Sequence, residues 1–241
     1  QDGTFLQKIH QTTPIDWFVY TSSLPKDHPE LQLAASLGIK TSKRDEFLNF
    51  LLEQKQLKLI AVAGTHGKTT TTAMLVWVAK QLNLPVSYLV GTTLNFAPSG
   101  YFDPNSQYFF YEADEYDRNF LHFHPYLALI TSLDYDHVDI YPTPEDYQAA
   151  FRQFEAQSQQ VIKEIAPDPR LSLSGAVRRQ DATLALSALK IAFPDLPEAK
   201  IINVLNQFPG ANRRFERLTD GVYSDYAHHP QEIAATLQIA S

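Results

Sequence analysis

The feature that most constrains this chain is the stretch LIAVAGTHGKTTTT at residues 59–72. Its first five residues, 59–63, are apolar and form a run typical of a strand that is buried on both faces. A glycine-containing turn follows at residues 64–69, and apolar residues at helical spacing begin at position 73. A strand, a glycine turn, a Lys-Thr pair and a helix in this order predict a phosphate-binding loop in an α/β fold.

Each part of this loop has a physical purpose. Gly64 and Gly67 allow backbone N–H groups to face bound phosphates, and the helix N-terminus adds positive potential. Lys68 supplies positive charge for the terminal phosphates, and the Thr69 hydroxyl is a candidate Mg²⁺ ligand. Val62 stands where the full consensus has a glycine, so this is a shortened loop. The alternative is a glycine turn with an incidental lysine. We expect the lysine side chain to face solvent.

Composition limits the classes of function. The 241 residues carry a net charge of −7 and no cluster of lysine and arginine, which argues against a nucleic-acid surface. The chain contains no cysteine, so disulfides and thiolate metal sites are excluded. No apolar run reaches the ~18 residues of a membrane span, and no signal peptide is recognised. We expect a cytoplasmic protein that binds neither nucleic acid nor membrane, and the oligomeric state stays open.

Apolar runs alternate with amphipathic patterns along the chain, which predicts an α/β fold with a mainly parallel sheet. We expect three parts: residues 1–57, a central domain at 58–211, and the start of a further domain at 212–241. Strands are expected at residues 17–20, 39–41, 59–63, 86–90, 107–111, 126–131, 161–162 and 222–225. Helices are expected at residues 31–37, 44–53, 69–82, 144–159, 181–193, 198–208 and from 227 onwards.

Acidic residues follow two of the expected central strands. Three carboxylates lie within residues 112–115, and an Asp-His pair lies at 136–137. Open α/β sheets bind ligands at the carboxyl ends of their strands, and Mg²⁺ prefers oxygen ligands. The spacing therefore indicates a phosphate or metal site. A solvated turn is the alternative for the acidic run, and a structural role is the alternative for the histidine.

Two further groups of polar residues lie near the end of the chain. Arg213 and Arg214 are either solvated surface charges or the source of an arginine that reaches a terminal phosphate from another domain. The spacing of residues does not decide between these roles. His228 and His229 are adjacent, which is too close for a zinc motif on one helix face.

Five blocks in order resemble one known family. They are AGTHGKTTTT, EADEYDRNFL, TSLDYDHVDIY, ANRRFERL and DYAHHPQEIAATL. Together they are similar to the Mur ligases of peptidoglycan synthesis, with a match over about residues 16–241. The resemblance implies three domains: a partial UDP-sugar domain, a central ATP-binding domain, and the start of a Rossmann-like domain that receives the amino acid.

The resemblance also implies a reaction. ATP phosphorylates the carboxylate of UDP-N-acetylmuramate to an acyl phosphate, and the amine of an amino acid then attacks it to form an amide. Several Mur ligases carry a carbamylated lysine where this chain has Phe151. In having no lysine at this position, the chain resembles the branch of the family that adds L-alanine. The implied cofactors are ATP and Mg²⁺, and the implied substrates are UDP-N-acetylmuramate and L-alanine.

The resemblance assigns roles to individual residues. The phosphate cradle would comprise Gly64, Thr65, His66, Gly67, Lys68, Thr69 and Thr70. The magnesium-site residues would be Thr69, Glu112 and His137. The catalytic residues would be Lys68, Glu112, His137 and Arg214, of which Arg214 reaches the ATP phosphates. Asp225 would lie near the ribose, and His228 and His229 would line the amino-acid site.

Two departures from the family pattern stand out. Ser132 replaces an asparagine before the Asp-His pair, and Arg179, Gln180 and Asp181 replace a block whose asparagine lies near the adenine. Base preference is therefore an open question. Two other functions remain as alternatives: a recycling ligase that adds a preformed tripeptide, and a non-catalytic nucleotide-binding relative.

One stretch is shorter than the resemblance implies. Several more strands are expected after residues 161–162, but only residues 163–174, with two prolines, precede Gly175. A strand takes about five residues and each connection several more, so this stretch is too short for them. We expect that the chain lacks segments of a longer three-domain protein. A natural variant with a smaller sheet is the alternative.

Overall fold

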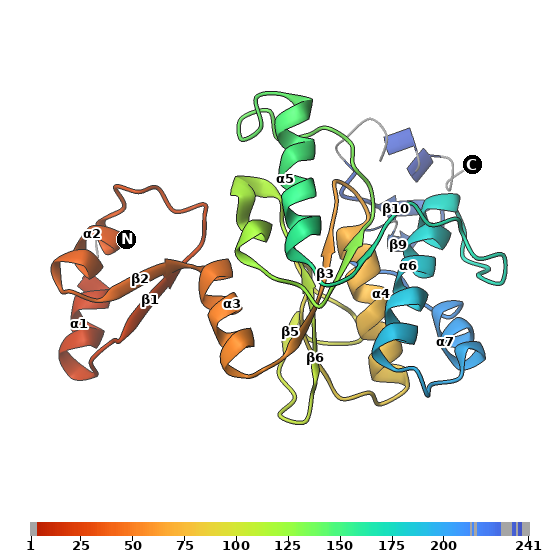
Figure 1. Cartoon of the computed structure of the whole chain (residues 1–241), viewed down its shortest axis with the longest axis horizontal. Coiled ribbons are helices and arrows are strands. Elements are labelled where there is room, and N and C mark those ends of the chain that lie inside the picture. The colour runs from red at the N-terminus through yellow and green to blue at the C-terminus, as the bar shows by residue number, and fades with distance from the viewer. Residues whose placement is uncertain (1–3, 213, 215, 228–232, 235, 238–241) are drawn as a thin grey trace. The chain divides into compact units, whose positions relative to one another are not determined.

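The computed structural model describes residues 4–212, 214, 216–227, 233–234 and 236–237 (Figure 1). Contacts between Cα atoms divide the chain into two compact units, Gln1–Lys55 and Gln56–Ser241. Within the described part of the chain, no helix has both the length and the apolar character needed to cross a membrane.

The first unit is a small α/β layer. Strands β1 (Trp17–Tyr20) and β2 (Lys40–Lys43) pair in parallel, with Trp17 opposite Lys40. Helices α1 (Thr4–Thr12), α2 (Pro29–Ser36) and α3 (Arg44–Gln54) complete the unit. The sequence analysis assigned no element to α1, although Leu6 on this helix is buried in a core with Ala34 and Ile39.

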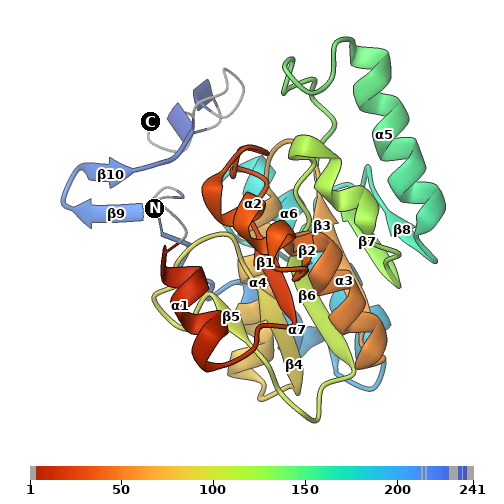
Figure 2. The ribbon, with the colours of Figure 1, turned by 90° about the vertical axis from the view of Figure 1, so that its left-hand side faces the viewer.

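The second unit is built on a six-stranded sheet with the order β5-β4-β6-β3-β7-β8, whose strands are spread out across Figure 2. Five strands are parallel, and only the edge strand β5 is antiparallel. The strands are β3 (Lys58–Ala63), β4 (Val86–Leu89), β5 (Gly100–Tyr101), β6 (Tyr108–Glu112), β7 (Leu127–Ile130) and β8 (Val161–Ile162). The predicted mainly parallel α/β sheet is confirmed.

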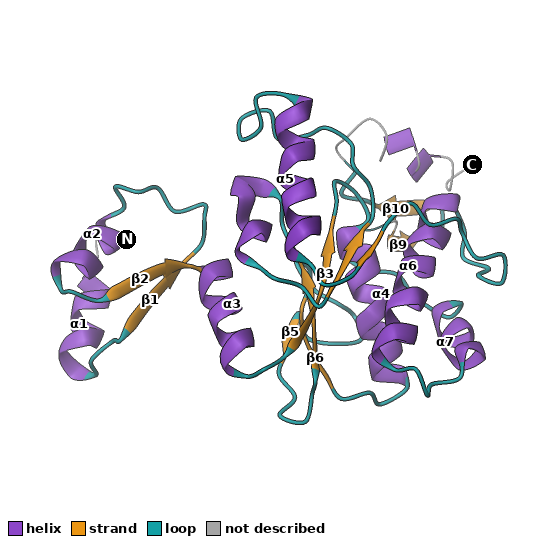
Figure 3. Cartoon of the chain, viewed as in Figure 1, coloured by secondary structure: helices purple, strands orange, loops and turns teal. Residues whose placement is uncertain are grey.

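Helices cover both faces of this sheet (Figure 3). One face packs against α4 (Lys68–Gln81), α6 (Ala176–Ala192) and α7 (Glu198–Leu205). The other face lies under the 3-10 segment η1 (Tyr116–His122) and α5 (Pro144–Gln157), which contact each other through aromatic rings. Because β3 is buried on both sides, Leu59 to Ala63 are all apolar, as the continuous run in the sequence predicted.

The order of the strands brings three loops together. Strand β3 lies between β6 and β7, and all three run in the same direction. Their carboxyl ends therefore meet at one edge, where the phosphate-loop sequence, the acidic run and the Asp-His pair all begin.

Most expected elements are present, but several boundaries were wrong. Helix α6 begins at Ala176, five residues before the expected start at 181. Gly175, with φ of +84°, precedes the helix, and residues 176–180 are exposed or half-buried, so no run of buried apolar residues marks its start. The sequence analysis also assigned no strand to β5 or to β9 (Glu216–Thr219), which pairs with β10 (Val222–Ser224). Most of the helix expected from 227 onwards lies outside the described residues.

The short stretch after β8 contains no strand. Residues 163–175 connect β8 to α6 without regular secondary structure, so the sheet ends at the two-residue strand β8. The additional strands that the family resemblance implies have no counterpart among these residues.

We predict that Leu129→Ala lowers the free energy of unfolding by about 2–5 kcal/mol, because it leaves a cavity in the core between the sheet and α6. Leu129 on β7 is fully buried, whereas Leu218 on β9 is 61% exposed and serves as the control. Thermal and urea unfolding of both alanine variants measures the effect. Equal stability of the two variants would contradict the assignment of this core.

Candidate functional site

The phosphate-loop sequence forms the turn between β3 and α4. Gly64 has φ of +133° and Gly67, the residue before α4, has φ of +84°, both in a region that side chains rarely adopt. A Cβ atom on Gly64 would lie 2.3 Å from Thr131 Oγ1. The backbone therefore requires both glycines. Gly64 is also closely approached by the segment after β7, and Gly67 by Asp181 on α6.

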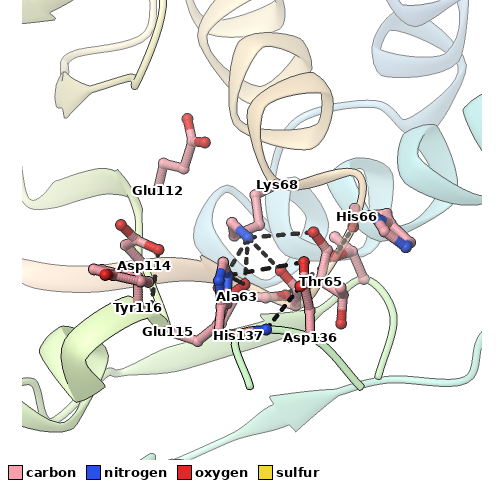
Figure 4. A network of polar contacts seen from close by, with 12 residues as sticks. Ala63, Thr65, His66, Lys68, Glu112, Asp114, Glu115, Tyr116, Asp136 and His137 are labelled. Carbon is pink, nitrogen blue, oxygen red and sulfur yellow. Dashed lines mark hydrogen bonds and ion pairs between the residues drawn. The ribbon is translucent and has the colours of Figure 1, made fainter. Parts of the chain in front are cut away.

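Lys68 points back across this loop rather than into solvent (Figure 4). Its Nζ atom donates to the Gly64 carbonyl oxygen at 2.6 Å and to Glu115 Oε1 at 2.9 Å. The Lys68 side chain is only 15% exposed, and that of Glu115 is 1% exposed. The expectation of a solvent-facing lysine was therefore wrong, because the buried carboxylate of Glu115 attracts the ammonium group.

Glu115 also joins the Asp-His pair to the loop. His137 Nε2 lies 3.4 Å from Glu115 Oε1. Burial raises the pKa of Glu115, but Lys68 and His137 outweigh burial and hold that pKa below its usual range. The hydrogen bond to Glu115 in turn raises the pKa of His137 above its ordinary value.

Glu112, the last residue of β6, contacts a different residue of the Lys-Thr pair. Its carboxylate accepts from Thr69 Oγ1 at 2.6 Å and from the Gly91 backbone N–H at 2.8 Å. Arg214 Nη2 lies 3.4 Å from the same Thr69 hydroxyl. These side chains line a cavity of about 360 Å³ together with Gly91, Thr92, Asn212 and Tyr226.

The expected site residues thus form two groups. Thr69, Glu112 and Arg214 face the 360 Å³ cavity, whereas Lys68 and His137 meet at Glu115. Among the described residues, no group of three or more histidine, aspartate or glutamate side chains could hold a metal ion by itself. Thr70 is half-buried on α4, and Asp225 accepts from the Ala227 N–H at 2.7 Å. His228 and His229 lie outside the described residues.

The segment after β7 holds the other side of the loop. The Thr131 hydroxyl donates to the His66 carbonyl oxygen, and Ser132 Oγ accepts from the His66 N–H at 2.9 Å. The Thr65 hydroxyl contacts Asp134 and Tyr147. The sequence analysis selected neither Glu115 nor Tyr147 for the site. Glu115 stood in the acidic run, but its spacing did not separate it from Glu112.

A second cavity adjoins the loop. It has a volume of about 410 Å³, and His66, Ser132, Gln180 and Asp181 are among the residues that line it. Ser132, Gln180 and Asp181 are positions at which the sequence departs from the family pattern, so these three departures lie together around one cavity.

Asp181 lies directly behind the phosphate loop. Its carboxyl is buried, and its Oδ1 atom would lie 2.5 Å from a Cβ atom on Gly67. Burial raises the pKa of Asp181 to about 7, although the charges of Arg178 and Arg214 act in the opposite direction. A carboxyl with this pKa is partly neutral near pH 7.

We predict that Asp181→Asn stabilises the fold above pH 7. The pKa of Asp181 is higher in the folded state than in the unfolded state. Its contribution to the free energy of unfolding is therefore complete below about pH 4, where the carboxyl is neutral in both states, and it is lost as the pH rises toward 7 and the buried carboxyl ionises. Because asparagine does not ionise, the variant keeps the free energy of unfolding that the parent loses, which is at most about 4 kcal/mol for a pKa raised from its ordinary value to about 7.

Thermal unfolding of the parent and the variant between pH 5 and 8 tests this prediction. The melting temperature of the parent should fall over this range more steeply than that of Asp181→Asn. The exposed Asp195→Asn serves as the control and should follow the parent. Parallel curves for all three proteins would show that Asp181 does not titrate in this way.

The fold and the site define the general class of this protein. It is an α/β protein in which a parallel sheet presents a phosphate-binding type of loop, Lys68 and Thr69 at its carboxyl edge. Residues 62–170 match the family model described as the Mur ligase middle domain. This match and the relatives described below confirm the resemblance to the Mur ligase family that the five sequence blocks predicted.

Similar sequences point to one branch of this family. The UDP-N-acetylmuramate–L-alanine ligase of Clostridium tetani is 32% identical over 97% of this chain and 63% of its own length. The ligase of the same name from Lactiplantibacillus plantarum is 32% identical over 91% of this chain and 60% of its own length. The chain thus spans about three-fifths of the length of these relatives. The alignment with the Clostridium tetani protein covers 287 positions, more than the 241 residues of the chain, so it contains gaps within this chain.

Solved structures show the same fold. The UDP-N-acetylmuramate-alanine ligase of Thermotoga maritima superimposes with a TM-score of 0.77 at 23% identity, covering 93% of this chain and 63% of that structure. The UDP-N-acetylmuramate:L-alanyl-gamma-D-glutamyl-meso-diaminopimelate ligase of Neisseria meningitides gives 0.73 at 22% identity, covering 88% of this chain and 83% of that structure.

Proposed function

We propose that this chain is the nucleotide-binding part of an ATP-dependent ligase that joins L-alanine to the carboxylate of UDP-N-acetylmuramate through an acyl phosphate. The observation that carries this proposal is the phosphate loop with Lys68 and the Thr69–Glu112 pair at one edge of the sheet. The names of the relatives that are about 30% identical support the alanine-adding reaction.

The loop residues provide the phosphate cradle in this proposal. The backbone N–H groups at the start of α4 and the ammonium group of Lys68 offer positive charge to bound phosphates. Lys68 is held between the Gly64 carbonyl oxygen and the Glu115 carboxylate, so we infer that bound phosphates add a further anionic partner to an ammonium group already in place. Thr65, His66 and Thr70 complete the cradle.

The residues beside Thr69 fit a magnesium ion. Mg²⁺ is normally held by one or two protein oxygens and by phosphate and water. The hydroxyl of Thr69 and the carboxylate of Glu112, 2.6 Å apart, are such oxygens. When bound, the ion would neutralise phosphate charge during transfer of the terminal phosphate. His137 would act through Glu115, which it contacts, or as a further ligand after closure of the site.

Arg214 completes the charged side of the 360 Å³ cavity. Its guanidinium lies close to Thr69, where it would stabilise the charge of a transferring phosphate. Asp225 would bind the ribose, and His228 and His229 would line the site of the amino-acid acceptor. Residues 212–241, which carry these side chains, would close over the bound substrates and would take part in removing the proton from the attacking amine.

A second candidate acceptor is a preformed peptide. The solved structure from Neisseria meningitides is named for a ligase of L-alanyl-gamma-D-glutamyl-meso-diaminopimelate and has a similar fold. Release of ADP by the full-length gene product, with UDP-N-acetylmuramate and either L-alanine or the tripeptide, distinguishes the two. We expect release with L-alanine. Release with the tripeptide alone would favour the recycling ligase, and release with neither would favour a non-catalytic relative.

We predict that Lys68→Ala abolishes ATP turnover and also lowers stability. The substitution removes the positive partner of a carboxylate that is 1% exposed, and breaking a buried ion pair costs about 3–5 kcal/mol. Adding Glu115→Gln removes the stranded charge, so the double variant should recover most of the melting temperature without recovering turnover. Turnover near the parent value in a folded Lys68→Ala protein would refute the role of this lysine.

We predict that Glu112→Gln raises the Mg²⁺ concentration required for ATP turnover, because a neutral amide binds the ion less well than a carboxylate. The amide oxygen can still accept from the Gly91 N–H, and the amide NH2 can donate to the Thr69 hydroxyl in place of the bond that the carboxylate accepts, so the fold should be preserved. His137→Ala should act in the same direction. Overlapping curves of activity against Mg²⁺ for parent and variants would show that these residues are structural.

A further inference from the structure

The hydroxyl group of Thr65 joins three segments that are distant in the sequence. It belongs to the phosphate loop, and it lies 2.6 Å from the Asp134 carbonyl oxygen and 2.9 Å from the Asp134 N–H, both in the segment after β7. It also lies 2.7 Å from the hydroxyl of Tyr147 on α5. One oxygen atom therefore links the loop, the segment that leads to His137, and a helix.

The direction of these hydrogen bonds follows from the groups involved. A carbonyl oxygen only accepts and a backbone N–H only donates, so Thr65 donates its single proton to the Asp134 carbonyl and accepts from the Asp134 N–H. Tyr147 must then be the donor in the remaining contact. This arrangement uses one donor and two acceptor positions of the Thr65 hydroxyl, which is its full capacity.

The ring of Tyr147 is held in place by other aromatic side chains. Tyr147 is 1% exposed, and its ring lies 5.0 Å from those of Tyr141 and Phe151. The contact with Tyr141 is edge-to-face, with an angle of 88° between the rings, a favoured geometry for aromatic pairs. The position of the Tyr147 hydroxyl is thus set by packing before any ligand binds.

Tyr141 supports Glu115, the residue whose carboxylate accepts from Lys68. Its hydroxyl donates to the Glu115 backbone carbonyl at 2.6 Å, and the Tyr141 side chain is buried. Lys68 is bound on one side by the loop that Tyr147 supports and on the other side by the carboxylate of Glu115. Each of the two packed tyrosines therefore supports a segment that holds the lysine: Tyr147 contacts Thr65 in the loop, and Tyr141 contacts the backbone of Glu115.

We propose that Tyr141 and Tyr147 are positioning residues that together fix the ammonium group of Lys68 at the phosphate loop. Neither tyrosine contacts the phosphates in this proposal, and both act through the groups that hold Lys68. A site held in advance by surrounding hydrogen bonds loses less entropy when a ligand binds, so the pair would strengthen nucleotide binding. The proposal rests on the proposed binding of ATP by this loop.

The test compares matched tyrosine-to-phenylalanine variants. Tyr147→Phe and Tyr141→Phe each remove one hydroxyl group and keep the ring. Tyr88→Phe on β4 is the control, because Tyr88 is also 1% exposed and its hydroxyl has no hydrogen-bond partner among the described residues. Titration calorimetry of MgADP measures affinity for the whole chain, and hydrogen exchange without nucleotide measures the mobility of the loop amides.

We expect the affinity for MgADP to fall about three- to tenfold in Tyr147→Phe and in Tyr141→Phe, as for the loss of one hydrogen bond. Tyr88→Phe should bind as the parent does. Exchange should rise at the amides of Thr65 and Asp134 in Tyr147→Phe and leave the amides of β3 and α6 unchanged. Because both tyrosines fix the same lysine, the double variant should lose less affinity than the two single losses combined.

Two results would overturn the proposal. The first is affinity and loop exchange in Tyr147→Phe equal to those in Tyr88→Phe. The second is a uniform rise of exchange over the whole unit in Tyr147→Phe, which would show a purely structural role. A parent chain that binds no MgADP would instead contradict the proposed function, while the exchange measurement would still decide whether Tyr147 holds the loop.

Discussion

The site depends on one buried carboxylate. Glu115 is withdrawn from water and carries negative charge only because Lys68 and His137 lie against it. An unpaired charge in this position would be costly, so the three groups must be brought together when the chain folds. They come from the segments after β6, β3 and β7, and their pairing therefore fixes how these segments meet.

The sheet makes this meeting possible. Because β3 lies between β6 and β7 and runs parallel to both, the three connections leave the same edge. Helices on both faces exclude water from the strands, which explains why Leu59 to Ala63 of β3 are all apolar and why polar residues follow where the strand ends. The aromatic side chains of η1 and α5 then support the loops from one side, and Tyr147 on α5 packs against Tyr141 and Phe151.

Two carboxylates contact neighbouring residues of the loop. Glu115 faces Lys68, whereas Glu112 faces Thr69 and lies near Arg214 in the 360 Å³ cavity. This separation suits a ligase in which one carboxylate keeps the lysine in position and the other is available to a magnesium ion. The similarity to alanine-adding ligases gives this geometry its proposed substrates, over the three-fifths of their length that the chain spans.

The sequence by itself determined the loop, the alternation of strands and helices, and the family, because each depends on residues that are neighbours in the chain. Gly64, Gly67, Lys68 and Thr69 were found in this way. Only the tertiary structure decided which acidic residue serves which partner. Glu112 and Glu115 are three residues apart in one acidic run, and strand alternation followed by a turn sends them to different groups. The same holds for Tyr147, an ordinary helix residue in the sequence, whose contact with Thr65 spans 82 positions and exists only because β7 lies beside β3.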